Sequence, residues 1–135
     1  MSNLKFKGNA SGTGVVTLTS PNTSTDVTLV LPGAVDTLTD GATITPDLAD
    51  NSTFTVTLAG NRTMANPSNP VAGMTGSIFI VQDGTGSRTL AWGSYWDFTT
   101  GTAPTLTTTA GAVDRVDYIV RTTGSIHAVF TGDYS

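Results

Sequence analysis

The 135-residue sequence contains no cysteine, which excludes a disulfide framework and a thiolate metal site. It also has no glutamate, because all ten acidic residues are aspartates, and it has only two lysines and one glutamine. The straight-chain residues that favour helices are therefore nearly missing. No apolar run approaches the roughly 20 residues that span a bilayer, and no apolar segment typical of a signal peptide follows the N-terminus. We expect a protein that is made in a cytoplasm and has no membrane partner.

Positive charge is scarce as well. The formal net charge is -4, and the four arginines are scattered along the chain. Binding to nucleic acid requires a basic stripe or patch on the protein surface. The sequence therefore predicts no nucleic-acid partner.

Candidate catalytic and metal-binding residues are few. His127 is the only histidine, so it cannot build a two-histidine metal site, and no serine or threonine nucleophile has a second base. Asp114 and Asp117 could pair as the acid and base of a glycosidase. In a strand, however, a separation of three residues places them on opposite faces. We expect no catalytic site, no metal ion and no cofactor, and hence no enzyme.

The residues that are abundant favour β-structure. Threonine makes up about a fifth of the chain and valine is common, and β-branched side chains suit a pleated, half-buried surface. Alternation is clearest at 53–59, where Phe54, Val56 and Leu58 face one way and threonines face the other. Segment 77–82 is apolar on both faces, so we expect it at the centre of a sheet.

Further strands are predicted at 14–19, 26–31, 88–92, 113–121 and 126–131. The turn at 83–87 is expected to return segment 77–82 as a hairpin, and the last two strands should form another hairpin. Short strands with glycine-rich turns predict an all-β fold, namely a jelly-roll-like antiparallel β-sandwich with an extended N-terminal arm. In this prediction residues 1–40 form the arm and an accessory β segment, and residues 41–135 form the sandwich domain.

An aromatic cluster near the middle of the chain is the strongest candidate for a contact surface. Trp92, Tyr95 and Trp96 lie within five positions of one another, and Phe98 follows closely. Flat aromatic rings stack on sugars, and tryptophan is enriched at protein interfaces. We favour a role in the core or at a subunit interface, and contact with a glycan is the alternative.

Two sets of residues resemble known viral modules. The first set is similar to a short β-module that recurs in phage tail-fibre and related virion proteins, and comprises Phe6-Lys7-Gly8, Ser11-Gly12-Thr13, Val16-Thr17-Leu18, Ser20-Pro21 and Val27 to Pro32. The second resembles modules of phage and environmental-virus structural proteins, and comprises Leu58 to Thr63, Asn66 to Pro70, Ile80 to Leu90 and Ser125 to Phe130. The resemblance implies a bacteriophage virion structural protein. It carries over no catalytic residue, and it does not specify one place on the virion.

A capsid decoration, or cement, protein is the function that we expect first. A small acidic β-domain with an arm suits this role, whereas a tail fibre is usually long. The resemblance implies a homotrimer on the capsid surface, where it would stabilise the assembled head by bridging subunits of the major capsid protein. We expect the trimer contact at Trp92, Tyr95, Trp96 and Phe98, and the capsid contact at Leu4, Lys5, Phe6 and Lys7.

The alternative is a small tail-fibre or receptor-binding β protein. In that case the aromatic cluster would contact host surface glycans instead of a sister subunit. Both functions place the protein on a virion, and they differ in its position and partner.

Overall fold

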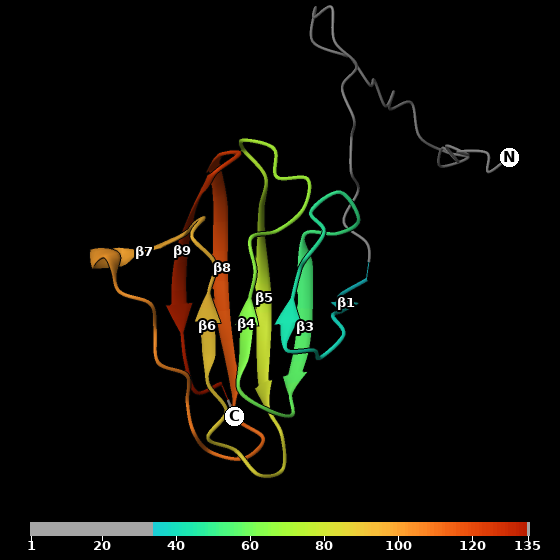
Figure 1. The fold of residues 1–135 in the computed structure, drawn as a ribbon, viewed down its shortest axis with the longest axis vertical. Coiled ribbons are helices and arrows are strands. Elements are labelled where there is room, and N and C mark those ends of the chain that lie inside the picture. The colour runs from blue at the N-terminus through green and yellow to red at the C-terminus, as the bar shows by residue number, and fades with distance from the viewer. Residues whose placement is uncertain (1–33, 135) are drawn as a thin grey trace, which may run out of the picture.

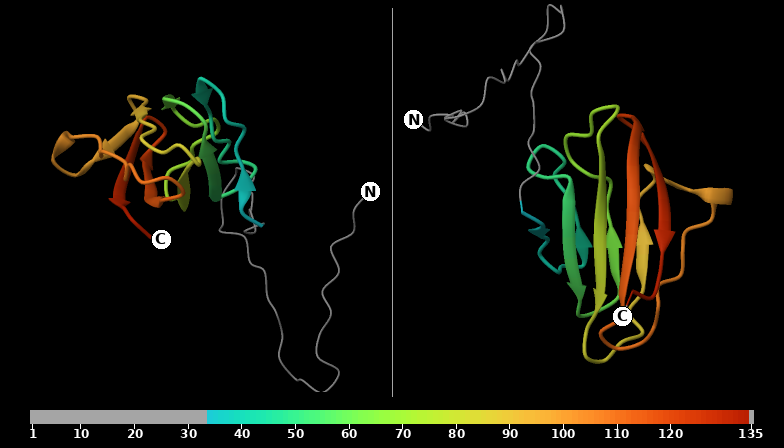
Figure 2. Two further views of the ribbon diagram at one scale, coloured as in Figure 1. Left: turned by 90° about the horizontal axis from the view of Figure 1, so that it is seen from below. Right: turned by 180° about the vertical axis from the view of Figure 1, so that it is seen from behind.

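A computed structural model describes residues 34–134 as two facing β-sheets. The larger sheet has six strands in the order β1-β3-β5-β8-β9-β7, and the smaller sheet has three in the order β2-β4-β6. Figure 1 shows the smaller sheet in front of the larger one, and the left view of Figure 2 shows the two layers from below. The strands are β1 (Asp36–Thr37), β2 (Thr43–Ile44), β3 (Thr53–Leu58), β4 (Arg62–Met64), β5 (Thr75–Gln82), β6 (Leu90–Trp92), β7 (Trp96–Phe98), β8 (Val113–Thr122) and β9 (Ser125–Thr131).

The first six strands form three stacked coils. Each coil has one strand in the larger sheet followed by one in the smaller sheet, so the coils are β1–β2, β3–β4 and β5–β6. Strands that stack on one another are parallel: Phe54 lies between Asp36 and Ile78, and Thr63 lies between Thr43 and Ala91. This part of the chain is therefore a short parallel β-solenoid, in which each coil contacts its neighbours.

An antiparallel hairpin closes one end of the solenoid. β8 pairs antiparallel with β5, and β9 pairs antiparallel with β8 across the turn at 122–125, as the sequence predicted. β7 then pairs in parallel with β9 at the far edge of the larger sheet. Within residues 34–134 the solenoid thus has an open end at β1 and β2 and a closed end at the β8–β9 hairpin.

The predicted all-β, sandwich-like class is confirmed, but the strand pairing differs from an antiparallel jelly roll. Among residues 34–134, five of the seven strand pairings are parallel. The reason lies in the turns, which carry the chain from one sheet to the other. The turn at 83–87, which was predicted to form a hairpin, leads from β5 in the larger sheet to β6 in the smaller sheet.

Polar side chains hold the successive turns on top of one another. The Arg62 guanidinium, after β3, donates to the Asp40 carboxylate, after β1, at 2.8 Å and 2.7 Å. The Asn61 side-chain oxygen accepts a hydrogen bond from the Thr89 backbone N–H at 3.1 Å. Because each bond joins two neighbouring coils, the polar corner residues help to fix the register of the stack.

Asp83 closes the turn of the third coil. Its Oδ1 accepts the backbone N–H groups of Thr85 and Gly86 at 3.0 Å and 2.9 Å, and Arg88 donates to its Oδ2 at 2.7 Å. The hydrogen bond from Arg88 is the main cause that lowers the pKa of Asp83 from 3.8 to about 2. The folded pKa therefore lies below the unfolded pKa, so this carboxylate stabilises the fold fully only above the unfolded value.

We expect the melting temperature to fall as the pH decreases from about 4 to about 2, because Asp83 takes up its proton in that range. The fall should be shallower in Asp83→Asn, which has no carboxylate to titrate at this turn. Circular dichroism melts at matched pH values measure both slopes. Equal slopes in the two proteins would show that other carboxylates determine the acid response.

The core lies between the two sheets. Phe54, Val56 and Leu58 of β3 are fully buried, whereas the threonines of that strand face outward, as the alternation predicted. β5 lies between β3 and β8 and buries Ile78 and Ile80, so its predicted central position is confirmed. The boundary expected near residue 40 stays a prediction, and the predicted arm and the strands at 14–19 and 26–31 lie outside the described residues.

Candidate interaction surfaces

The predicted aromatic cluster forms beside the core. Trp92 makes edge-to-face contacts with Trp96 and Phe98, with ring centroids 5.4 Å and 4.9 Å apart. Trp96 is only 6% exposed, and its Nε1 donates to the Ala65 carbonyl oxygen at 2.9 Å. Tyr95, with Trp92 and Phe98, packs partly buried against the core. Such ring geometry is typical of well-packed aromatic groups.

Burial separates the roles that these rings can play. Trp96 is a core residue and offers almost no surface to a glycan, so a Trp96→Ala variant would remove core packing and would not report on glycan binding. Trp92, Tyr95 and Phe98 keep part of their surface. Their predicted contact with a sister subunit stays a prediction. The Trp92 Nε1 is buried and has no hydrogen-bond partner within residues 34–134.

A groove lies next to this cluster, at the β7–β9 edge of the larger sheet. Two hollows, with volumes of about 350 Å³ and 170 Å³, lie along this edge. Both hollows are lined by Phe98, Thr99, Ala128 and Val129. The larger adds Asp97 and His127, and the smaller adds Thr102, Pro104 and Phe130. We call these nine residues the edge groove.

The edge groove exists because β7 is short. It pairs with β9 only as far as Ala128, and the chain then leaves through the 3-10 turn η1 (Thr99–Gly101). Figure 1 shows this segment projecting from the side of the larger sheet. The Ile126 N–H donates to the carbonyl oxygen of Tyr95, the residue before β7, at 2.7 Å, so this N–H points to the β7 side of β9. Since backbone groups alternate along a strand, the N–H and C=O of Phe130 point to the same side, where β7 has ended.

Polar residues gather at the other end of the edge groove. His127 lies beside Asp97 in the parallel β7–β9 register, and both side chains are exposed. The Asp97 carboxylate accepts a hydrogen bond from the Ser125 hydroxyl at 2.6 Å, and the Ser125 hydroxyl in turn accepts one from Arg121 at 3.2 Å. The Asp97 side chain is thus held in place by Ser125 while it stays exposed.

The loop that borders the edge groove is strained. Thr100 has a φ of 65°, in the left-handed region. A β-branched residue rarely adopts this conformation, and it costs of order 1–3 kcal/mol. Gly101, with a φ of 70°, continues the same turn without that cost. Strain of this kind is concentrated at binding and switch regions.

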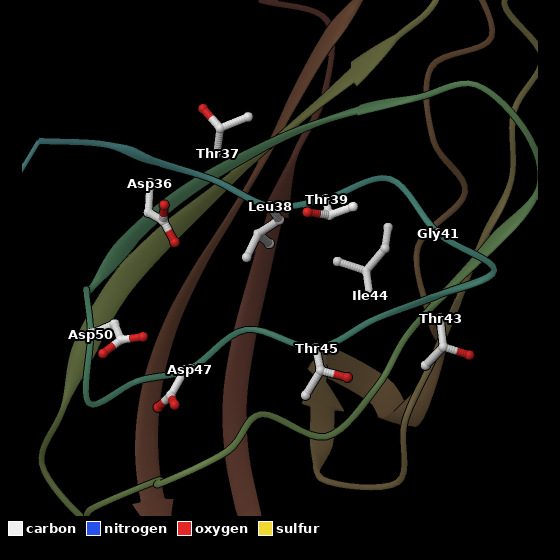
Figure 3. A pocket seen from close by; sticks show the side chains of 10 residues that line it. All are labelled: Asp36, Thr37, Leu38, Thr39, Gly41, Thr43, Ile44, Thr45, Asp47 and Asp50. Atoms are coloured by element: carbon white, nitrogen blue, oxygen red, sulfur yellow. The ribbon is translucent and has the colours of Figure 1, made fainter.

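A second hollow lies at the open end of the solenoid. It has a volume of about 400 Å³ and lies between the segments of β1 and β2. Figure 3 shows Leu38 and Ile44 projecting into the space between these segments, with Asp47 and Asp50 on one side. The outer edges of β1 and β2 pair with no further strand among the described residues. The described stack of coils therefore ends here.

The two aspartates considered as an acid pair are on opposite faces of β8, as their spacing predicted. Asp114 is 1% exposed and points inward, where it accepts the backbone N–H of Thr107 at 2.8 Å. Asp117 lies on the outer face, where it accepts a hydrogen bond from the Ser77 hydroxyl at 2.6 Å. These two carboxylates therefore do not face each other across a cleft.

The remaining predictions concern the capsid contact, metal ions and the membrane. The predicted capsid contact at Leu4, Lys5, Phe6 and Lys7 lies outside the described residues. Between residues 34 and 134, no group of three or more histidine, cysteine, aspartate or glutamate side chains is placed to hold a metal ion. That same stretch contains no helix of the length and apolarity needed to cross a membrane.

The fold and its surfaces describe a compact all-β module, and the comparisons with known proteins define its class. Residues 44–125 match the family described as "Putative phage tail fibre C-terminal domain". The match runs from β2 to the start of β9 and covers more than half of the chain, so the chain belongs to this family. It is a bacteriophage virion structural protein. No curated protein and no solved structure matches the chain.

Proposed function

We propose that this protein is part of a phage tail fibre and contacts the host surface. The family match over residues 44–125 is the observation that carries the proposal. The first expectation, a capsid decoration protein that bridges coat subunits, relied on the length and acidity of the chain. Those properties fit a fibre module equally well, whereas the family is described by its place in a tail fibre. Capsid decoration is therefore the competing function.

The direction of the chain suggests how the module is oriented in a fibre. Ala34 and Val35 precede β1, so the first described residues lie at the open end of the solenoid. The edge groove lies at the other edge of the larger sheet, beyond β9 (Figure 1). In a fibre that continues from residues 1–33, the groove would then face away from the point of attachment. This orientation supports a role of the groove in contact with the host.

Antibody labelling of intact virions tests the proposed location. We expect gold-labelled antibodies raised against the purified protein to bind at the tail in negatively stained virions. The same antibodies should block adsorption to host cells. Labelling spread over the head, with adsorption unaffected, would instead support capsid decoration.

A further inference from the structure

We propose that residues 14–31 of the same chain dock on the open end of the solenoid and add a fourth coil to the stack. In this arrangement residues 14–19 pair in parallel with β1 in the larger sheet, and residues 26–31 pair in parallel with β2 in the smaller sheet. The docked segment covers strand edges that no strand of residues 34–134 covers. The inference does not depend on the place of the protein on the virion.

The outer edge of β1 presents backbone groups that point away from the stack. The Leu38 N–H donates to the Thr55 carbonyl oxygen of the next coil at 2.8 Å. Because backbone groups alternate along a strand, the N–H and C=O of Thr37 point to the opposite, open side. An edge with such groups is a template for another strand.

The outer edge of β2 is exposed in the same way. The carbonyl oxygens of Ala42 and Ile44 accept the N–H groups of Thr63 and Ala65, at 3.1 Å and 2.8 Å. Thr43 lies between these two acceptors, so its own N–H and C=O face the open side. Both sheets therefore offer an edge at this end, and a segment that crosses from one sheet to the other can pair with both.

Apolar side chains lie between the two edges. The hollow of about 400 Å³ at this end is bordered by Leu38 and Ile44, and Figure 3 shows both side chains projecting into the space. Val35, just before β1, is 49% exposed. In a solenoid the core is continued from coil to coil, and the end of the stack needs a cover. The apolar residues of a further coil would fill this hollow.

Residues 14–31 have the alternation that such a coil needs. Val16 and Leu18 alternate with threonines in the first predicted strand, as the buried residues of β3 do. The second predicted strand has apolar residues at alternate positions, namely Val27, Leu29 and Leu31. Each strand can therefore turn one apolar face to the core. Asp26 is the single charged residue in this segment, so docking removes little charge from water.

The lengths of the connections agree with one further coil. The corner between the two predicted strands, residues 20–25, is six residues long. The corresponding corners of the described coils are residues 59–61, 38–42 and 83–89, which are three, five and seven residues long. The chain from residue 31 to Asp36 spans up to about 17 Å, and facing sheets are about 10 Å apart. The segment can therefore reach both edges of its own domain.

Charge disfavours the open end of a second copy as the occupant. Asp36 and Asp50 are exposed, and with Asp47 they border the hollow. No lysine or arginine is among the described residues that line it. Two open ends docked on each other would therefore bring carboxylates together without a cationic partner. Residues 14–31 bring a single aspartate and avoid most of this repulsion.

Hydrogen exchange of the full-length protein, followed for each amide by NMR, tests the proposal. We expect the amides of Thr37 and Thr43 to exchange at least about 100-fold more slowly than in an unstructured chain, because the docked strands accept them. The Leu38 amide, which donates within the stack, is the internal reference for folding. Free exchange of Thr37 and Thr43 beside a protected Leu38 would overturn the proposal.

Two neighbouring substitutions test the face through which the segment docks. Leu29→Asp places a charge on the apolar face of the second predicted strand, so the amide of Thr43 should lose its protection. Val30→Asp is the matched control, because it adds the same charge on the outer face, and it should keep that protection. The Leu38 amide should stay protected in both variants. Equal exchange of Thr43 in the two variants would overturn docking through this face.

A spin label separates docking within one chain from exchange of segments between copies. The chain has no cysteine, so Ser24→Cys accepts a single label in the corner that the proposal stacks on residues 38–42. We expect the amide signals of Asp40 and Gly41 to broaden when label and ¹⁵N are on the same chain. They should stay sharp when spin-labelled unlabelled-isotope protein is mixed with ¹⁵N protein. Broadening in the mixture, or in neither sample, would overturn docking within one chain.

Discussion

Asp114→Ala is expected to destabilise the protein by about 2–6 kcal/mol. The Asp114 carboxylate is buried between the sheets and accepts two backbone N–H groups, from Thr107 at 2.8 Å and from Asp133 at 3.0 Å. Thr107 precedes β8 and Asp133 follows β9, so this one side chain ties the loop before the hairpin to the segment after it. Alanine leaves both donors without a partner, at about 1–3 kcal/mol each.

Urea denaturation of the unmodified protein and of Asp114→Ala measures this loss in the free energy of unfolding. Asp114→Asn keeps one side-chain acceptor, so its destabilisation should be intermediate. Asp117→Ala is the matched control, because it removes a carboxylate from the outer face of the same strand, where Arg115 pairs with it at 2.9 Å. Exposed ion pairs contribute about 1 kcal/mol or less. Equal losses in Asp114→Ala and Asp117→Ala would contradict the inward role of Asp114.

Gly76→Ala is expected to destabilise the protein by about 3 kcal/mol or more, or to prevent folding. A Cβ at this position of β5 would collide with the Ser52 carbonyl oxygen and lie 2.5 Å from the Tyr118 hydroxyl. Neither group can move freely, because the Tyr118 hydroxyl donates to that carbonyl at 3.0 Å and the Ser77 N–H donates to it at 3.1 Å. Overpacking at such a rigid contact costs about 1–3 kcal/mol, and more where backbone must shift.

Gly84→Ala is the control for this prediction. A Cβ at Gly84, in the turn after β5, would have no atom within 4 Å. We expect its effect on the free energy of unfolding to be within about 0.5 kcal/mol, as for other open surface sites. Thermal melts of the two variants compare them directly. A Gly76→Ala protein as stable as Gly84→Ala would show that β5 and Ser52 are farther apart than described.

The longer strands could be predicted from the sequence because they are half-buried and show a period of two. β3 alternates fully buried Phe54, Val56 and Leu58 with threonines, and the β8–β9 hairpin has a short turn between two long strands of alternating burial. In each case the local pattern and the tertiary burial agree. That agreement explains why the all-β class and the final hairpin were correct.

The parallel stacking could not be predicted from the same signals. β1, β2, β4, β6 and β7 have two or three residues each, which is too short for a period to be seen. Their positions are set by contacts between coils, such as Arg62 with Asp40, which are 22 residues apart. A turn such as 83–87 also has the same composition whether it forms a hairpin or a corner between two sheets. The prediction of a hairpin followed antiparallel pairing, because antiparallel strand pairs are more frequent than parallel ones.

The candidate site could be predicted only in part. Trp92, Trp96 and Phe98 are close in sequence and come together as a cluster, but sequence could not tell that Trp96 faces the core. The edge groove was missed because Asp97 and His127 meet only through the parallel pairing of β7 with β9. The polar His127 between the apolar Ile126 and Ala128 was the one local sequence signal that this face of β9 is open.

The number of copies per virion is the most direct test of the central claim that this protein belongs to a tail fibre. Quantitative mass spectrometry of purified virions, with the major coat protein as the internal reference, measures it. The tail-fibre account predicts a handful of copies, far below the number of coat subunits, and their recovery with purified tails. A copy number comparable to that of the coat protein would contradict the account and establish a decoration of the head.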